Sequence, residues 1–300
     1  MEKEFKTYKE QIRLLKSKCL VISDEDHAID TLKRTSYFAL INGYKRPFKD
    51  TNGNYLPEAR FEDVENLYIL DEQMRVFFLG HLLTLETQIK SSISYNFTQK
   101  FREPNAYLNA NNYNYTAKNT QAINTLVSIL QGIYDRNDHR YITHYKKKHK
   151  GEVPLWVLIN AMTFGQVSKM YSLLKESEQQ RICGNFGITS QKDMLAILDI
   201  LTLYRNVCAH NERLYDFNTK HQLGKQYIEP YTRCDPAPDY NNIGKRLFGA
   251  LAVCAYLTGN INMLDEFRSL MKKAVIMQNP RLKAHLIEEI MLPVGWLDNE

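Results

Sequence analysis

Three polar side chains stand close together in the segment LYRNVCAHNERLY, residues 203–215. Arg205 and Asn206 are adjacent, and His210 follows four residues after the asparagine. Histidine suits proton transfer because its unperturbed pKa, about 6.5, lies near working pH. The guanidinium of arginine keeps its charge and matches the oxygens of a phosphate. These residue types therefore suit cleavage of RNA without a metal, in which a 2′-hydroxyl attacks the neighbouring phosphate.

Helical geometry limits what one copy of these residues can do. Asn206 and His210 are four apart and share a helical face. Arg205 and His210 are five apart, which places them about 140° apart around a helix. One helix therefore displays a divided site, which a second copy related by a two-fold axis would complete. On this ground we expect a homodimer.

The same residues also have a purely structural interpretation. Arg205 and Asn206 could cap the polar end of a core helix, with His210 packed beside them. A second pair, Arg75 and His81, shows how easily the loose spacing arises, since about one accidental match is expected with 8 histidines in 300 residues. That pair lies in an apolar pattern and lacks the asparagine, so we interpret it as structural. Spacing alone favours the structural interpretation at Arg205 as well.

Composition and charge exclude several classes of protein. The 5 cysteines are scattered and never spaced as CxxC, which argues against a disulfide scaffold and against a zinc site. The N-terminus is charged from its second residue, unlike a signal peptide, and the longest apolar run, residues 247–259, is too short to span a bilayer. No glycine-rich phosphate-binding motif is present. We expect a cytoplasmic protein with no membrane association, no metal and no cofactor, whose charge of +5 is compatible with a polyanionic partner.

Helical spacing recurs along the chain and predicts an all-α fold. Between Phe61 and Phe97, apolar residues recur at intervals of three and four, which predicts one long helix or two helices broken near Gly80. The polar segment 48–60 contains Asn-Gly and a proline, and predicts a turn or short hairpin loop. It divides residues 1–60, an N-terminal helical extension and linker, from residues 61–300, the main helical domain.

Two capping boxes mark predicted helix starts, Ser23 with Asp26 and Ser190 with Asp193. The second precedes the apolar run that ends at the candidate site. Four residues around that end are predicted to pack into the core: Leu203, Tyr204, Val207 and Cys208. Trp156, in a later helical pattern, is likewise expected in the core.

The most basic segment is HRYITHYKKKHK, residues 139–150. Arg140, Lys146, Lys147 and Lys148 would neutralise phosphates, and the interleaved tyrosines would stack on unpaired bases. The alternative is a solvated basic loop, which is what such runs usually form. The histidines of this segment are spaced by five, which does not suit a shared metal. The four basic residues are our candidate RNA contacts.

Several segments resemble one bacterial family. LTLYRNVCAHNERLYDF is similar to the signature of the AbiD/AbiF-type abortive-infection proteins, which resemble the wider HEPN superfamily of helical domains. The superfamily's mark is arginine, a polar residue, about three others, and histidine. Further likeness lies in VENLYILDEQMRVFFLGHLLTLETQIKSSISY and PLWVLINAMTFGQVSKMYSLL, and together with an N-terminal stretch it covers most of residues 8–217.

The resemblance implies a HEPN-like helical bundle with an N-terminal helical extension, acting as a metal-independent endoribonuclease in toxin-like defence against phage. Carried over by position, Arg205 and His210 match the catalytic pair, and Asn206 matches the polar position. Active domains of the superfamily usually pair, and some relatives are restrained by an antitoxin or a small RNA. The implied partners are thus RNA as substrate, a regulatory small RNA or an antitoxin, and a second copy of the chain.

Alternatives remain at this stage. HEPN domains without nuclease activity exist, so a non-catalytic RNA-binding or protein-interaction module of the same fold is the second hypothesis, and an antitoxin-like partner is the third. Glu86 and Lys90, four apart, predict an ion pair on a helix surface. The likeness of their helix to the family also allows Glu86 a supporting role at the site.

Overall fold

The computed structural model describes residues 4–136, 138–232 and 237–298. Throughout these ranges the regular structure is helical, and β-pairing is limited to two isolated bridges, Val21 with Arg60 and Lys49 with Tyr55. The prediction of an all-α fold is confirmed. In the same ranges, no helix is both long enough and apolar enough to cross a membrane.

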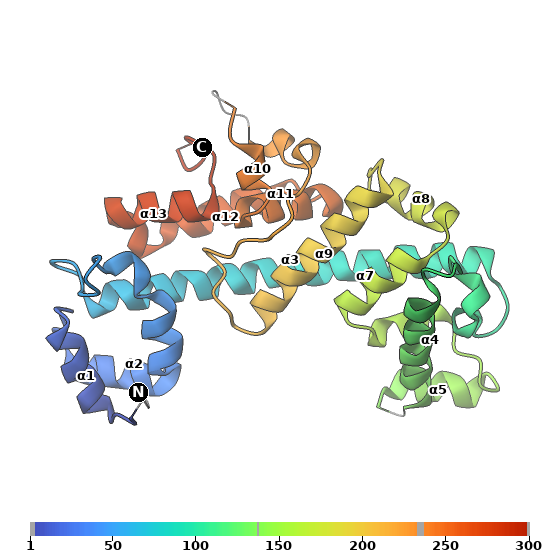
Figure 1. Ribbon diagram of the computed structural model, residues 1–300, viewed down its shortest axis with the longest axis horizontal. Helices are drawn as coiled ribbons and strands as arrows, with labels where there is room; N and C mark the ends of the chain where they lie inside the picture. The colour runs from blue at the N-terminus through green and yellow to red at the C-terminus, as the bar shows by residue number, and fades with distance from the viewer. Residues whose placement is uncertain (1–3, 137, 233–236, 299–300) are drawn as a thin grey trace.

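Helix α3 (Phe61–Lys100) is the axis of the molecule, and the other elements pack along its 40 residues (Figure 1). Buried apolar side chains recur along its whole length, from Phe61 to Phe97. The helix runs unbroken through Gly80, so the prediction of one long helix is confirmed over that of two. A glycine costs a helix only about 1 kcal/mol, and burial on both sides of Gly80 outweighs that cost.

Two short helices, α1 (Tyr8–Ser17) and α2 (Glu25–Thr35), pack against each other near the start of α3 (Figure 1). The capping residue of α2 is Asp24, whose carboxylate accepts a hydrogen bond from the His27 N–H at 2.9 Å. The predicted cap at Ser23 is therefore wrong by one residue. Aspartate and serine cap equally well, and a carboxylate also interacts favourably with the helix dipole.

The polar segment that follows forms the predicted turn. Lys49 and Tyr55 form an antiparallel bridge across it, and Val21 pairs with Arg60 in a second, parallel bridge. The bridge between Val21 and Arg60 joins the segment between α1 and α2 to the beginning of α3. The division of the chain at residue 60 into an extension and a main domain stays a prediction.

Five helices lie at the second half of α3, three of them packed against it and two packed on those three (Figure 1). They are α4 (Thr120–Asp135), α5 (Arg140–Lys148), α6 (Leu155–Leu158), α7 (Phe164–Leu173) and α8 (Glu176–Asn185). The basic segment 139–150 is thus mostly helix, so the alternative interpretation of this segment as a loop is wrong. Its Ile142 is fully buried and its Tyr145 is partly buried against the core, and these apolar contacts hold the polar helix against the rest of the protein.

Helix α9 (Gln191–Ala209) crosses α3 and packs against it and against α7. The chain then continues into four C-terminal helices on the other side of α3: α10 (Tyr240–Ile243), α11 (Leu247–Thr258), α12 (Asn262–Lys273) and α13 (Pro280–Ile290). Helix α11 is buried along nearly all of its length, which confirms the prediction of a buried helix for residues 247–259.

Candidate active site at the end of helix α9

Helix α9 holds the candidate residues at its C-terminal end. Its N-cap is Ser190, as predicted, whose hydroxyl accepts a hydrogen bond from the Asp193 N–H at 3.2 Å. The other half of the predicted capping box is wrong, because the Asp193 carboxylate accepts from the Tyr227 hydroxyl, at 3.0 Å, instead of from the Ser190 N–H. Three of the four predicted core residues, Tyr204, Val207 and Cys208, are buried. The prediction for Leu203 is wrong, because this side chain is 47% exposed on the face that turns away from α3 and α7.

Asn206 and His210 lie together on the exposed side of the helix end. His210 is the C-cap residue, and its backbone N–H donates to the Asn206 carbonyl at 2.9 Å. Arg205 points elsewhere: its side chain is only 27% exposed and approaches α3. The structure thus brings Asn206 and His210 to one face and places the arginine on another, in agreement with the divided site expected from helical angles.

A buried carboxylate on α3 meets the arginine. The Arg205 Nε lies 3.6 Å from Glu86 Oε2, and Glu86 Oε1 lies 2.7 Å from Lys90 Nζ. Among the described residues, neither Arg205 Nε nor Glu86 Oε2 has a hydrogen-bond partner, so their attraction is electrostatic. The predicted pair of Glu86 with Lys90 is confirmed, but its placement on the surface is wrong. Both residues are buried because α9 crosses α3 at this point.

The loop after His210 is anchored by a second buried carboxylate. Asn211 has a left-handed backbone (φ 58°), which turns the chain out of the helix. The N–H groups of Leu214 and Tyr215 then donate to Asp71 of α3, at 3.0 and 2.7 Å. This contact sets where the chain leaves α9, and so helps to set the position of His210.

Asp71 is itself part of a buried network. It accepts a hydrogen bond from the Tyr44 hydroxyl at 2.7 Å and forms an ion pair with Arg75, which also donates to the Glu212 carbonyl at 3.4 Å. Burial raises the pKa of the Asp71 carboxyl, whereas the guanidinium and the hydrogen bonds to it act in the opposite direction. Sequence reasoning missed this anchor, for which the only local signal was the spacing of Asp71 and Arg75 by four.

The structural interpretation of Arg75 and His81 is confirmed. Arg75 is 3% exposed and is engaged by Asp71 and the loop, which leaves it unable to reach a substrate. His81 packs its ring against Phe77, with centroids 4.7 Å apart, and burial lowers its pKa. The match of this pair to the loose arginine–histidine spacing is accidental.

Cysteine chemistry does not contribute to this end of α9. Burial raises the pKa of the Cys208 thiol to about 12, so the group remains protonated and poorly nucleophilic at neutral pH. Cys19, Cys183 and Cys254 are also unpaired, and Cys234 lies outside the described residues.

The candidate RNA contacts lie on α5, which the structure does not bring to the end of α9 (Figure 1). Arg140, Lys147 and Lys148 are exposed, and none of the three has an ion-pair partner within the described part of the chain. The Lys146 ammonium lies over the Tyr134 ring, 4.1 Å from its centroid, in a cation–π contact. Helix α5 therefore offers a basic surface separate from the arginine and histidine.

A family relationship is now established by comparison. The model of a family described as Abi-like protein matches residues 30–216, which extend from within α2 to just past α9. The chain belongs to the Abi-like protein family. The matched region of this Abi-like protein contains the three candidate residues of α9 and both anchoring carboxylates of α3. Membership in this family points to a role in abortive infection, as the resemblance of the sequence implied. No match was found among curated proteins or among solved structures.

Proposed function

We propose that this Abi-like protein is a metal-independent endoribonuclease of a bacterial abortive-infection system, built on a HEPN-like fold. The observation that carries the proposal is the end of α9. There, Asn206 and His210 share an exposed face, and Arg205 is held against a buried carboxylate of α3. A residue that merely capped the helix would need neither the charge of Glu86 nor the anchored loop that follows.

Each side chain has a role in this reaction. His210 acts as general acid and base, taking the proton of the attacking 2′-hydroxyl or donating one to the leaving 5′-oxygen. Arg205 stabilises the charge that builds on the phosphorane, and Glu86 orients the guanidinium. Asn206 orients a phosphate oxygen or the imidazole. The products carry a 2′,3′-cyclic phosphate and a 5′-hydroxyl.

A homodimer completes the site in this proposal. Arg205 and His210 of one copy lie on different sides of α9, so a compact site needs a second helix end facing the first. Leu203 supports such a contact because it is an exposed apolar residue one turn from Asn206. Ala209, small and exposed, lets a second helix approach closely on the same side.

Cleavage of single-stranded RNA by the purified protein in EDTA tests this function. Wild type should cleave, and His210→Ala and Arg205→Ala should each lower the rate by at least about 100-fold, the range for general acid–base catalysis and charge stabilisation. The matched control is His221→Ala, since this exposed histidine has no role in the proposed reaction and should leave the rate unchanged. A strict requirement for added metal, or undiminished cleavage by His210→Ala, would disprove the assignment.

The second candidate function is a non-catalytic RNA-binding module, and the basic surface of α5 favours it. Lys147 and Lys148 would hold RNA with or without cleavage. In that case Lys147→Gln/Lys148→Gln weakens RNA binding while wild type yields no cleavage products. Growth after induction separates the two functions in cells: the nuclease predicts arrest by wild type and normal growth with Arg205→Ala/His210→Ala. An inhibitory small RNA or antitoxin would relieve that arrest.

A further inference from the structure

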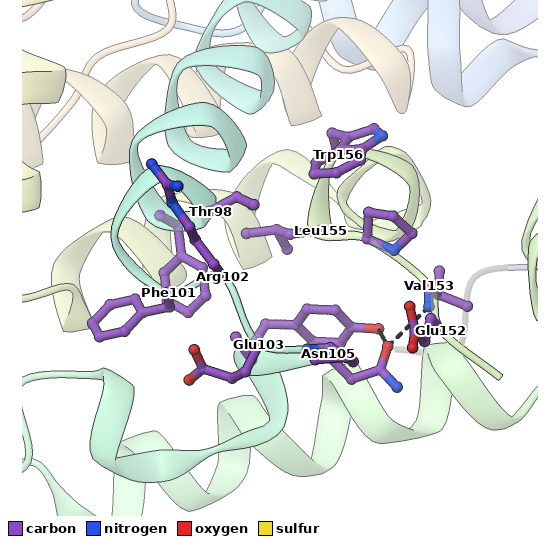
Figure 2. Close-up of a pocket in the computed structure, with 14 residues that line it drawn as sticks. Thr98, Phe101, Arg102, Glu103, Asn105, Glu152, Val153, Leu155 and Trp156 are labelled. Carbon is purple, nitrogen blue, oxygen red and sulfur yellow. Dashed lines mark hydrogen bonds between the residues drawn. The ribbon is translucent and has the colours of Figure 1, made fainter. Parts of the chain in front are cut away.

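A pocket of about 150 Å³ opens where α3 ends and α6 begins (Figure 2). Its walls combine apolar side chains with a charged rim. The apolar part includes Phe101, Tyr107 and Leu155, and the charged rim includes Arg102, Glu103 and Glu152. The Abi-like family match and the proposed catalytic residues assign no role to this pocket.

Asn105 holds the walls of the pocket together. Its backbone is left-handed (φ 52°), and its side-chain oxygen accepts hydrogen bonds from the Val153 N–H at 2.9 Å and the Tyr107 hydroxyl at 3.3 Å. Its amide nitrogen donates to the Gly151 carbonyl at 3.2 Å. One side chain thus joins the segment after α3 to the segment before α6, so the pocket is formed in advance of any ligand.

The size of the pocket limits what can enter. A cavity of about 150 Å³ holds a benzene-sized ring, so the single ring of a pyrimidine matches this pocket more closely than the two fused rings of a purine. The walls suit the faces of such a ring, because Phe101, Tyr107 and Leu155 are apolar. In Figure 2, Glu152 and Val153 lie beside Asn105 at one end of the pocket, and Phe101 lies at the opposite end.

The charges of the rim distinguish a base from a phosphate. Glu103 and Glu152 would repel a phosphate, but they can accept hydrogen bonds from the amino or imino group of a base. Hydrogen bonds from its own backbone N–H and from the Asn112 side chain, the latter at 2.8 Å, lower the pKa of Glu103 and favour its ionised form, which accepts hydrogen bonds. Arg102, which has no ion-pair partner among the described residues, is available to the phosphate that follows the base.

Trp156 extends the pocket at the surface. It was expected in the core, but its side chain is 52% exposed at the edge of the pocket (Figure 2). The four-residue helix α6 turns Leu155 and Leu158 inward, which leaves the indole outside. An exposed aromatic ring beside a base-sized pocket is a platform on which a neighbouring unpaired base stacks.

The pocket adjoins the basic helix α5. Helix α5 leads directly into its wall through Lys150 and Gly151, both in left-handed conformations. A single-stranded RNA held by the basic side chains of α5 can therefore continue into the pocket.

We propose that this pocket binds an unstacked pyrimidine base of single-stranded RNA, with the next base stacked on Trp156. The proposal rests on RNA being the ligand of the proposed function, and it adds a preference for pyrimidine at a site remote from the cleaved bond. It requires no movement of the chain, because Asn105 already holds both walls.

Binding of hexacytidylate, hexauridylate and hexaadenylate to the non-cleaving His210→Ala protein tests the proposal. Trp156 is the exposed tryptophan and Trp296 is buried, so quenching of tryptophan fluorescence reports stacking at the pocket. Pyrimidine oligonucleotides should quench it and bind at least about 5-fold more tightly than hexaadenylate. Trp156→Ala should abolish the quenching and weaken pyrimidine binding by about 5-fold to 150-fold, the range for loss of one stacked base.

A matched pair of substitutions on α3 tests the cavity itself. Thr98→Phe fills the pocket from its lining, whereas Thr84→Phe adds the same ring on the exposed side of the same helix. We expect the first to abolish the pyrimidine preference and the second to retain it, with circular dichroism showing that both remain folded. Because Trp156 is exposed, Trp156→Ala gives the same test should Thr98→Phe fail to fold.

The outcomes separate this proposal from the proposed function. Pocket-dependent pyrimidine binding without cleavage by wild type would support the pocket and disprove the nuclease. Cleavage by wild type, with equal binding of all three oligonucleotides or no effect of Thr98→Phe and Trp156→Ala, would disprove the pocket and leave the nuclease in place. The second result would also be obtained if the pocket held a protein side chain instead of a base.

Discussion

Asp71 offers the sharpest test of how the candidate site is held in place. In Asp71→Ala, the Arg75 guanidinium loses its counter-ion in a buried position. The backbone N–H groups of Leu214 and Tyr215, now 3.0 and 2.7 Å from the carboxylate, lose their acceptor. The Tyr44 hydroxyl also loses the acceptor of its hydrogen bond. The substitution therefore releases the loop after α9 and leaves an unpaired charge inside the protein.

The size of the expected loss of stability follows from these contacts. Removing one partner of a buried ion pair costs about 3–5 kcal/mol, and a buried N–H left without an acceptor costs about 1–3 kcal/mol. The contributions share one carboxylate, and the loop can move to reach water, so they do not simply add. We expect Asp71→Ala to lower the free energy of unfolding by about 4–6 kcal/mol, a large part of the 5–15 kcal/mol typical of a domain.

Urea denaturation followed by circular dichroism measures this loss. With a slope of about 2–3 kcal/mol per molar urea, the midpoint should fall by about 2 M. Asp30→Ala is the matched control, since Asp30 pairs with Lys33 at 2.8 Å but both side chains are more than half exposed. It should leave the midpoint unchanged. Hydrogen exchange adds a local measurement: the amides of Leu214 and Tyr215 should lose protection in Asp71→Ala under native conditions.

Two results would refute this reasoning. One is a midpoint for Asp71→Ala that falls no further than that of Asp30→Ala. The other is a large fall in the midpoint with unchanged exchange at Leu214 and Tyr215, because the carboxylate would then stabilise the core without holding the loop. As an internal check, Asp71→Leu/Arg75→Met should be more stable than Asp71→Ala, since no buried charge is left unpaired.

Three further predictions concern single side chains. Glu86→Gln should slow RNA cleavage by about 10- to 100-fold in single-turnover assays of folded protein, because Arg205 loses the charge that orients it; an unchanged rate would exclude a positioning role. His27→Gln should lower the melting temperature by about 1–3 °C at pH 5.5 and leave it unchanged at pH 8.5. The hydrogen bond to Glu65 raises the pKa of His27, so its stabilisation is present below about pH 6.5 and is lost as pH rises through the raised value. His285→Gln should have the opposite pH profile, because burial lowers the pKa of His285 in the folded protein. As pH falls below about 6.5, the unfolded chain therefore binds more protons than the folded protein, and wild type loses stability. Melting curves of this variant between pH 7 and pH 5 should therefore be flatter than those of wild type.

Much of the fold was predictable from local pattern. The period of the apolar residues in α3 and the capping serine of α9 are properties of contiguous residues. They can therefore be predicted without knowing which elements pack against these helices. The predictions were wrong where contacts with other elements determine the local structure or its burial. Helix α5 looked like a loop because Ile142 is its only fully buried anchor, and Trp156 looked like core because apolarity alone does not say which side of a short helix faces inward.

At the site, the sequence alone determined that Arg205, Asn206 and His210 come at the end of a helix, and that the arginine and the histidine point to different sides. Those facts follow from spacing on a helix of known geometry. Only the tertiary structure decided which side chains contact these residues and the loop that follows them. Glu86 reaches Arg205, and Asp71 reaches Leu214 across 143 residues of sequence, because α9 and its following loop pack on α3. Contacts between distant segments depend on packing, and no local pattern records them.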